Sequence, residues 1–187
     1  MGTEGVDAPG VLTLNGKDYA VVRLLGKGKG GYTWLVERDG AQYALKQIHH
    51  EPCQYYAFGD KMAAELRDYE TLRALGVPLP ALLEADRGQE RLLKQLIPGE
   101  TVYRLALRDA VEPWQWEQVR ALSGALRRAG LNIDWFPTNF MCRYKVLYYV
   151  DYECNPYMEQ WSFEGWGARY WRPTPELEAY AREHGDL

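Results

Sequence analysis

Two oxygen-bearing side chains stand close together in the stretch DWFPTN, residues 134–139. Asp134 could accept a proton from an attacking hydroxyl group, and Asn139 could offer its amide oxygen to a hard cation. A second hard ligand, Asp151, follows the apolar run VLYYV. Mg²⁺ is commonly held by one or two such groups together with nucleotide phosphates. The same stretch could instead be a plain turn between two strands, so the interpretation depends on the rest of the chain.

The glycines of GKGKGG are candidates for a phosphate-binding turn. Gly26, Gly28 and Gly31 fit the pattern G-x-G-x-x-G, but the dinucleotide-binding form of this pattern must open a helix. Here the β-rich run YTWLV follows, which excludes that form. Glycines at the tip of a β-hairpin can place main-chain N–H groups over phosphates without obstruction by side chains. A merely flexible hairpin tip is the alternative.

A lysine on the next predicted strand could complete the phosphate site. Lys46 ends the run YALK, where alternation puts it on the opposite side of the strand from Tyr43 and Leu45. That direction points the ammonium group to the underside of the glycine turn. A strand lysine more commonly reaches out to solvent, which is the ordinary alternative.

A desolvated lysine needs an anionic partner, and the helical run after it offers Glu65 and Glu70. Glu65 lies close to the apolar stripe of that helix, whereas Glu70 lies well off it. Glu65 is therefore the candidate partner of Lys46. An ordinary solvated glutamate is the alternative.

The elements that must position these residues fall into two groups. In the first, Asn15-Gly16 and Asp39-Gly40 are strong hairpin signals. A helix ending near Gly76 follows, and then the strands ALLEAD and ERLLKQLI. We expect a compact antiparallel lobe of five strands and one helix over residues 1–97.

The pattern changes at Pro98-Gly99. The run PWQWEQVRALSGALRRAG is predicted to be a helix, with apolar residues on one face. The DWFPTN loop, a short strand near FMC, a turn at RYK, the strand VLYYV and a charged terminal helix complete a second lobe, residues 98–187. The two lobes together would make one domain.

The glycine hairpin, strand lysine, helix glutamate, D-x-x-x-x-N and strand-ending aspartate occur in the order and spacing of the protein-kinase-like superfamily. The chain resembles that superfamily over roughly residues 20–155. DWFPTN resembles the D-x-x-P-x-N loop of the aminoglycoside and choline kinase branch, VDYE its I-D-[WFY]-E, and LIPGET its hinge. The resemblance implies an α+β, two-lobed kinase-like fold, with a five-stranded antiparallel N-lobe and a truncated, mainly helical C-lobe.

It also implies a Mg²⁺- and ATP-dependent phosphotransferase and a role for each residue. The phosphates would be covered by Gly26, Gly28 and Gly31, and held by Lys46, which Glu65 would tether. The main chain of Gln95 and Ile97 would meet the adenine edge. Asp134 would be the catalytic base, and the metal ligands would be Asn139 and Asp151.

Three departures from the family pattern leave alternatives open. Asn132 stands where the family usually has a histidine, and Glu153 replaces the glycine of D-F-G. Few residues follow Asp151, which leaves little acceptor pocket and favours a macromolecular or dimer-completed acceptor site. The acceptor could be a protein Ser/Thr hydroxyl or a small-molecule alcohol. A pseudokinase, acting as a nucleotide-binding or scaffolding module, is the alternative from another class.

The composition argues against some classes of binding partner. The net charge of −4 argues against general attraction to nucleic acid or an anionic membrane, and no apolar run is long enough to span a bilayer. Three cysteines without a C-x-x-C pair argue against a zinc site or disulfide framework, so a cytoplasmic location is expected. The tail tryptophans, Trp161, Trp166 and Trp171, favour core packing over a docking or homodimer surface.

Overall fold

The computed structural model describes residues 9–51 and 59–185. The chain forms two compact units, Met1–Ala64 with Pro80–Leu96, and Glu65–Leu79 with Ile97–Leu187. The predicted lobe borders at residues 97 and 98 stay a prediction. Of the three cysteines, Cys53 lies outside the described residues, and Cys142 and Cys154 are free thiols.

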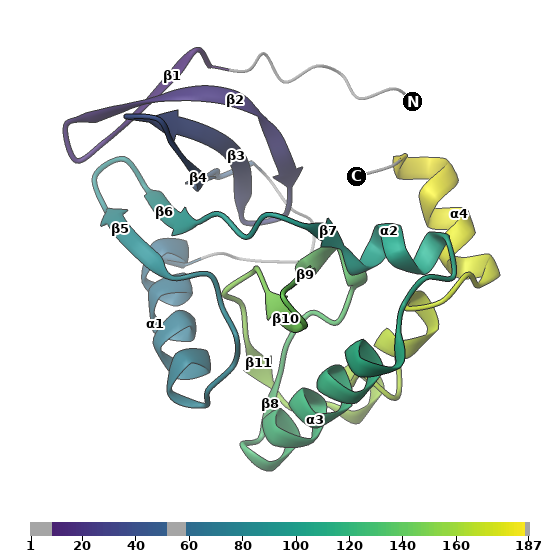
Figure 1. The fold of residues 1–187 in the computed structure, drawn as a ribbon. Coiled ribbons are helices and arrows are strands. Elements are labelled where there is room, and N and C mark those ends of the chain that lie inside the picture. Colours follow the sequence, from purple (N-terminus) through teal and green to yellow (C-terminus); the bar gives the residue numbers. More distant parts are fainter. Residues whose placement is uncertain (1–8, 52–58, 186–187) are drawn as a thin grey trace. The chain divides into compact units, whose positions relative to one another are not determined.

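A six-stranded antiparallel sheet makes up most of the first unit (Figure 1). Its strands are β1 (Val11–Leu14), β2 (Lys17–Lys27), β3 (Gly31–Arg38), β4 (Ala41–Ile48), β5 (Leu82–Asp86) and β6 (Arg91–Gln95). They lie side by side in the order β1-β2-β3-β4-β6-β5. The expected count of five strands is wrong by one, since the sheet has six.

Two tight turns fix the register of this sheet. Asn15 and Gly16 both have positive φ, 47° and 74°, and so do Asp39 and Gly40, 52° and 75°. Two successive residues in this region make the type I′ turn, whose twist matches that of the strands it joins. Both predicted hairpins are confirmed. The inward-facing side chains form a core whose buried members include Leu14, Trp34, Val36, Leu45 and Leu93.

Helix α1 (Lys61–Ala74) follows the first four strands and ends where the sequence predicts. Gly76 adopts φ 75°, and the N–H of Val77 donates to the carbonyl of Leu72 at 3.1 Å. A glycine in this conformation is the common way to stop a helix and satisfy its last carbonyls. The residues from Glu65 onward belong to the second unit, where Leu72 is fully buried.

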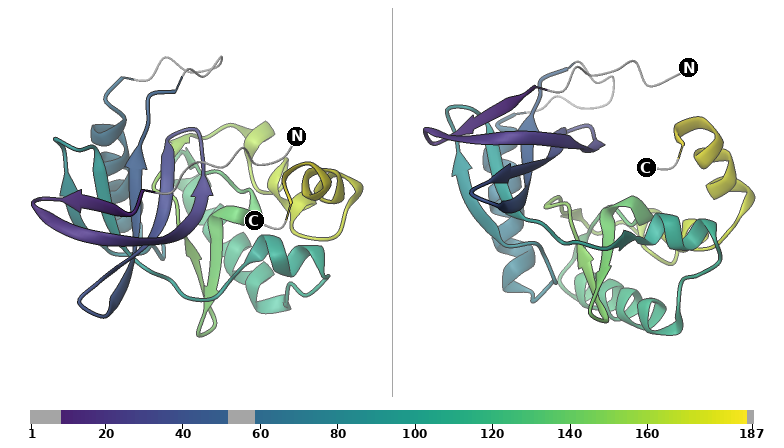
Figure 2. Two further views of the ribbon diagram at one scale, coloured as in Figure 1. Left: turned by 90° about the horizontal axis from the view of Figure 1, so that it is seen from above. Right: turned by 45° about the horizontal axis from the view of Figure 1, so that its top comes forward.

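The second unit combines helices with short antiparallel strands. Its elements are β7 (Glu100–Thr101), α2 (Val102–Leu107), α3 (Pro113–Arg128), β8 (Leu131–Asn132), β9 (Phe140–Arg143), β10 (Val146–Tyr149), β11 (Asn155–Pro156) and α4 (Pro175–His184), with 3₁₀ turns at Pro137–Asn139, Glu159–Trp161 and Gly167–Tyr170. Figure 2 shows the β9–β10 hairpin beside α3, and α3 packs against β10. The α+β content is therefore as predicted.

The tail aromatics mostly pack inside the second unit. Trp171 is fully buried with Trp135, Phe140 and Phe163, whose rings meet one another at centroid distances of 5.0–6.1 Å. Trp161 differs, since half of its surface is exposed. Core packing is therefore right for Trp171, and the homodimer stays a prediction. No helix among residues 9–51 and 59–185 combines the length and apolarity needed to cross a bilayer.

Candidate functional site

The DWFPTN loop is held in a defined conformation by its own hydrogen bonds. Oδ1 of the exposed Asp134 accepts a hydrogen bond from the N–H of Phe136 at 3.0 Å, and the chain then enters a 3₁₀ turn, Pro137–Asn139. The side-chain amide of Asn139 reaches back to the carbonyl of Asp134, at a long 3.4 Å. The loop therefore fixes the backbone around Asp134 while that side chain stays open to solvent.

The hairpin of β9 and β10 brings the two candidate metal ligands to one end. Phe140 pairs with Tyr149 in the antiparallel register. One residue further, the N–H of Val150 donates to the carbonyl of Asn139 at 2.9 Å. Asp151 follows directly, and its Oδ1 accepts the N–H of Tyr152 at 2.9 Å. Asn139 and Asp151 thus flank the same hydrogen-bonded end of the hairpin, as the metal hypothesis needs.

A buried phenol holds this region together. The hydroxyl of Tyr149 donates to the carbonyl of Glu153 at 3.0 Å, and it accepts a main-chain hydrogen bond from Asp134. Burial raises the pKa of Tyr149 well above its usual value, and the carboxylates of Asp151 and Asp134 raise it further. The phenol therefore stays protonated and joins the Asp134 loop to the segment after Asp151. The sequence gives no signal for this role beyond an apolar strand.

The side chain of Asn132 is hydrogen-bonded to two separate parts of the second unit. Its buried side chain accepts a hydrogen bond from the indole N–H of Trp135 at 2.8 Å and donates to the carbonyl of Trp161 at 2.7 Å. Its own strand, β8, pairs with β11. Both ends of the amide are used, as a buried polar group requires. Asn132 therefore connects Trp135 of the loop to the segment that carries Trp161.

One face of α1 lies on the segment that follows Asp151. The rings of Tyr69 and Tyr152 meet at a centroid distance of 4.6 Å, and Tyr152 is fully buried. Burial raises the pKa of Tyr152, with smaller contributions from Tyr69, Glu65 and Asp151. Glu65 is thus near enough to act electrostatically on the residue beside Asp151.

Glu65 and Glu70 are distinguished by their surroundings. Glu70 is exposed and forms an ion pair with Arg73 at 2.7 Å, whereas Glu65 is half-buried. This difference favours Glu65 as the functional glutamate. Its pairing with Lys46 of the first unit stays a prediction.

In the first unit, the glycine turn joins β2 to β3. Lys27 pairs with Tyr32, and the N–H of Gly28 donates to the carbonyl of Gly31 at 2.9 Å. A Cβ atom added to Gly31 would collide with the main-chain carbonyl of Gln47 on β4. Around Gly28, by contrast, the described residues leave open space. The predicted hairpin is confirmed. Gly31 has no room for a side chain, whereas Gly28 borders open space.

Lys46 reaches under this turn, as the strand alternation predicts. It lies on β4 opposite Thr33, and a Cβ atom added to Gly30 would lie 3.7 Å from its Nζ. The ammonium group therefore sits against the glycine turn. A side chain at Gly30 would occupy the space over that ammonium group, which is where an anion would be attracted.

A second lysine, which was not predicted from the sequence, lies near the turn. Lys61, the first residue of α1, is buried and donates to the carbonyls of His49 and Lys29, at 2.5 and 3.4 Å. The ring of His49 in turn contacts the carbonyl of Gly28 at 3.0 Å. Lys61 and His49 thus contact the main-chain carbonyls of two residues in the turn, Lys29 and Gly28. Only the tertiary fold brings Lys61 there, so no spacing in the sequence could have shown it.

The two predicted adenine-contacting positions lie on either side of a unit border. The N–H of Gln95 donates to the carbonyl of Ala81 at 2.8 Å. Any main-chain contact of Gln95 with an adenine edge would therefore have to use its carbonyl. Ile97, in the second unit, is buried. The role of both residues stays a prediction.

Within the described residues, no group of three or more His, Cys, Asp and Glu side chains could hold a metal ion by itself. Asn139 and Asp151 offer one amide oxygen and one carboxylate. That donor set suits Mg²⁺ when phosphates supply the remaining ligands.

Comparison by sequence finds neither a matching family model nor a matching curated protein. By structure, the chain is similar to the kinase domain of PknI from Mycobacterium tuberculosis, determined as a point mutant. The TM-score is 0.48 and the sequence identity is 22%. The match covers 79% of this chain and 63% of that one, so the chain spans less than two thirds of the domain that it matches.

Proposed function

We propose that this chain is an ATP- and Mg²⁺-dependent phosphotransferase of the protein-kinase-like type, with a hydroxyl group as acceptor. The observation that carries the proposal is the β9–β10 hairpin end, where Asn139 and Asp151 stand together and Asp134 opens the adjoining loop. A proton acceptor beside two hard oxygen ligands is what phosphoryl transfer requires. The resemblance to the aminoglycoside and choline kinase branch remains part of this proposal.

The residues of each unit fit the groups that the reaction needs. Asn139 and Asp151 would hold Mg²⁺, which neutralises charge on the phosphates when bound. Lys46 and the main chain of Gly26, Gly28 and Gly31 would hold the phosphates, and the space over Gly30 suits an anion.

Asp134 would act on the acceptor. Its exposed carboxylate would take the proton of the acceptor hydroxyl as the acceptor oxygen bonds to the γ-phosphorus and the bond from that phosphorus to ADP breaks. The N–H of Phe136 holds one carboxylate oxygen, and the Tyr149 phenol fixes the backbone behind it. Catalysis would thus come mainly from positioning and charge stabilisation.

The exposed side chain of Asp134 supports one class of acceptor over another. Its exposed position suits a hydroxyl presented by a macromolecule, such as a protein Ser or Thr, and a small-molecule alcohol is the alternative. A pseudokinase would have no use for Asp134. The hydrogen bonds that fix this loop favour an active enzyme over a scaffolding module.

The test is phosphoryl transfer from γ-labelled ATP, with the chain itself, a mixture of Ser/Thr peptides and a panel of small alcohols as acceptors. Transfer should require Mg²⁺ and should be lost in Asp134→Asn. Label in a peptide or in the chain supports a protein kinase, and label in an alcohol supports the small-molecule alternative. Mg-ATP binding without transfer to any acceptor would overturn the enzymatic proposal in favour of the pseudokinase.

A further inference from the structure

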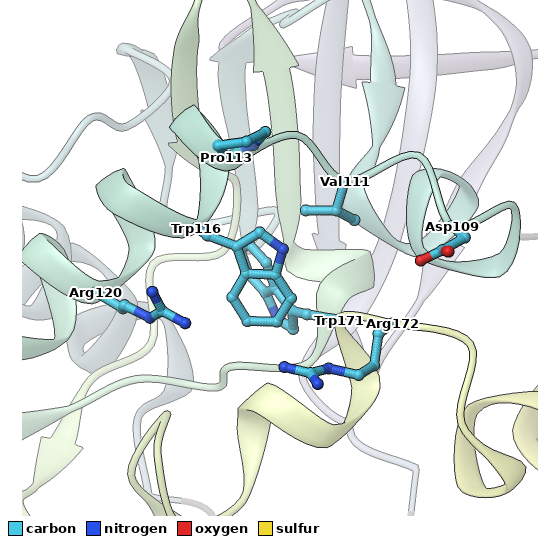
Figure 3. A pocket seen from close by; sticks show the side chains of 7 residues that line it. All are labelled: Asp109, Val111, Pro113, Trp116, Arg120, Trp171 and Arg172. Atoms are coloured by element: carbon cyan, nitrogen blue, oxygen red, sulfur yellow. The ribbon is translucent and has the colours of Figure 1, made fainter.

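An open cavity of about 430 Å³ lies in the second unit, and none of its lining residues is proposed to bind the nucleotide (Figure 3). The start of α3 and the loop before it form one side, with Val111, Pro113 and Trp116. The segment Trp171–Arg172 forms the other. The volume is in the range of sites that take small organic ligands.

Two arginines share one indole ring in this cavity. The guanidinium carbon of Arg120 lies 5.4 Å from the centroid of the Trp116 ring, and that of Arg172 lies 5.2 Å from it. Figure 3 shows the two guanidinium groups extending toward one another from opposite walls. Stacking on an aromatic face leaves the N–H groups at the edge of a guanidinium available to an anion.

Neither arginine has an anionic partner of its own. Across residues 9–51 and 59–185, the side chains of Arg120 and Arg172 make no ion pair and no hydrogen bond. Arg108, by contrast, forms a bidentate pair with Glu100. The two like charges repel one another, and an anion bound between them would remove that repulsion.

The remaining walls are apolar and fixed. Trp171 is fully buried, and its indole N–H donates to the carbonyl of Trp135 at 2.9 Å. Its ring lies 6.0 Å from that of Trp116. The one acidic residue among the lining side chains, Asp109, stands at the end opposite Arg120 in Figure 3. The anionic part of a ligand should therefore bind at the Arg120 end, with an apolar part against Val111, Pro113 and the exposed part of Trp116.

We propose that this cavity binds a phosphate monoester carried on a flat apolar group. Two guanidinium groups match the charge of a phosphate monoester, about −1.5 to −2 at pH 7, better than that of a carboxylate. The planar fork of arginine also suits phosphate oxygens. The site is independent of the proposed nucleotide site, because it uses none of its residues.

Phenyl phosphate is the probe that tests the proposal by titration calorimetry. It should bind at millimolar concentration to one site per chain, whereas phenol should not bind and inorganic phosphate should bind more weakly. Benzoate should also bind more weakly than phenyl phosphate. Arg120→Gln and Arg172→Gln should each lower the affinity about tenfold or more, because charge-assisted hydrogen bonds are lost.

Three matched variants make the result decisive. Arg128→Gln removes the same charge from the exposed face of α3 outside the cavity and should leave the affinity unchanged. Arg120→Lys keeps the charge without the fork, so its affinity should lie between those of wild type and Arg120→Gln. If Arg120→Gln fails to fold, Arg120→Lys should still bind more weakly than wild type. Lys46→Met should bind phenyl phosphate normally, which separates this site from the nucleotide site.

The proposal is overturned if phenyl phosphate does not bind, or if Arg128→Gln weakens binding as much as Arg120→Gln does. Tighter binding of benzoate would overturn the assignment to phosphate. A peptide carrying phosphotyrosine then distinguishes the source of the group. Binding of the peptide as tight as that of phenyl phosphate identifies a phosphorylated protein, and binding of phenyl phosphate alone identifies a small phosphorylated molecule.

Discussion

The main-chain N–H of Val150 donates a hydrogen bond to the carbonyl of Asn139 at 2.9 Å. This one contact fixes the spacing between two candidate magnesium ligands, Asn139 and Asp151. Asn139 accepts the hydrogen bond through its own carbonyl, and Asp151 is the next residue after the donor. The relative placement of the two side chains therefore depends on the β9–β10 register, which a backbone holds more rigidly than side chains could. A one-residue slip would turn one of the ligands away.

We predict that Asp151→Asn shifts the magnesium dependence of phosphoryl transfer. A neutral amide is a weaker ligand than a carboxylate, so half-maximal activity should need a higher Mg²⁺ concentration. The measurement is activity against Mg²⁺ at saturating ATP, with EDTA reducing wild type to background. Asp39→Asn, which makes the same charge change in a surface turn, is the control. An unchanged magnesium curve for Asp151→Asn would remove Asp151 from the metal site.

We predict that Asp134→Asn separates binding from turnover. The new amide oxygen can still accept the N–H of Phe136, so the loop should keep its shape. The proton acceptor is lost, and turnover should fall by about 10²- to 10⁴-fold. Nucleotide affinity, measured by calorimetry, should stay close to wild type. A mutant that turns over at the wild-type rate would show that Asp134 is only a turn residue.

Tyr149→Phe should destabilise the second unit and slow transfer. The change removes the hydrogen bond to the carbonyl of Glu153 and leaves the main-chain N–H of Asp134 without the phenol oxygen. Because each such hydrogen bond contributes about 0.5–1.5 kcal/mol, we expect a loss of about 1–3 kcal/mol in the free energy of unfolding, measured by urea denaturation. Tyr148→Phe, on the same strand and without those bonds, is the matched control. Equal losses in both variants would contradict the role given to Tyr149.

We predict that Gly31→Ala mainly lowers stability, whereas Gly28→Ala mainly lowers ATP affinity. In Gly31→Ala, the added methyl group meets the Gln47 carbonyl, so β3 and β4 must separate, and we expect a loss of about 1–3 kcal/mol in stability. In Gly28→Ala, the methyl group enters open space and stability should hardly change. If phosphates lie over the turn, Gly28→Ala should still lower ATP affinity. Thermal melts with and without Mg-ATP separate the two effects. An unchanged thermal shift in Gly28→Ala would place the phosphates elsewhere.

Much of the fold could be predicted because its signals are local. The turns at Asn15-Gly16 and Asp39-Gly40, and the stop of α1 at Gly76, depend on φ values that few residues adopt. Strand alternation also placed Lys46 beneath the glycine turn. The predicted count of five strands is one short of the six in the sheet.

The supports of the candidate site could not be predicted, because they come from distant parts of the chain. Tyr149 looks like an ordinary residue of an apolar strand, and only its neighbours show that its hydroxyl joins two loops. Lys61 reaches the glycine turn through carbonyls of residues well before it. Arg120 and Arg172 meet over Trp116 only after folding. Such contacts leave no periodic pattern.

The amide of Asn132 has a consequence for the response of the site to acidity. A histidine in this position would gain or lose a proton near physiological pH, and its hydrogen bonds to Trp135 and Trp161 would change with it. An asparagine has no such equilibrium. The support beneath Asp134 should therefore be the same from pH 5 to 8, so that an enzyme built in this way keeps its loop in order when its surroundings acidify.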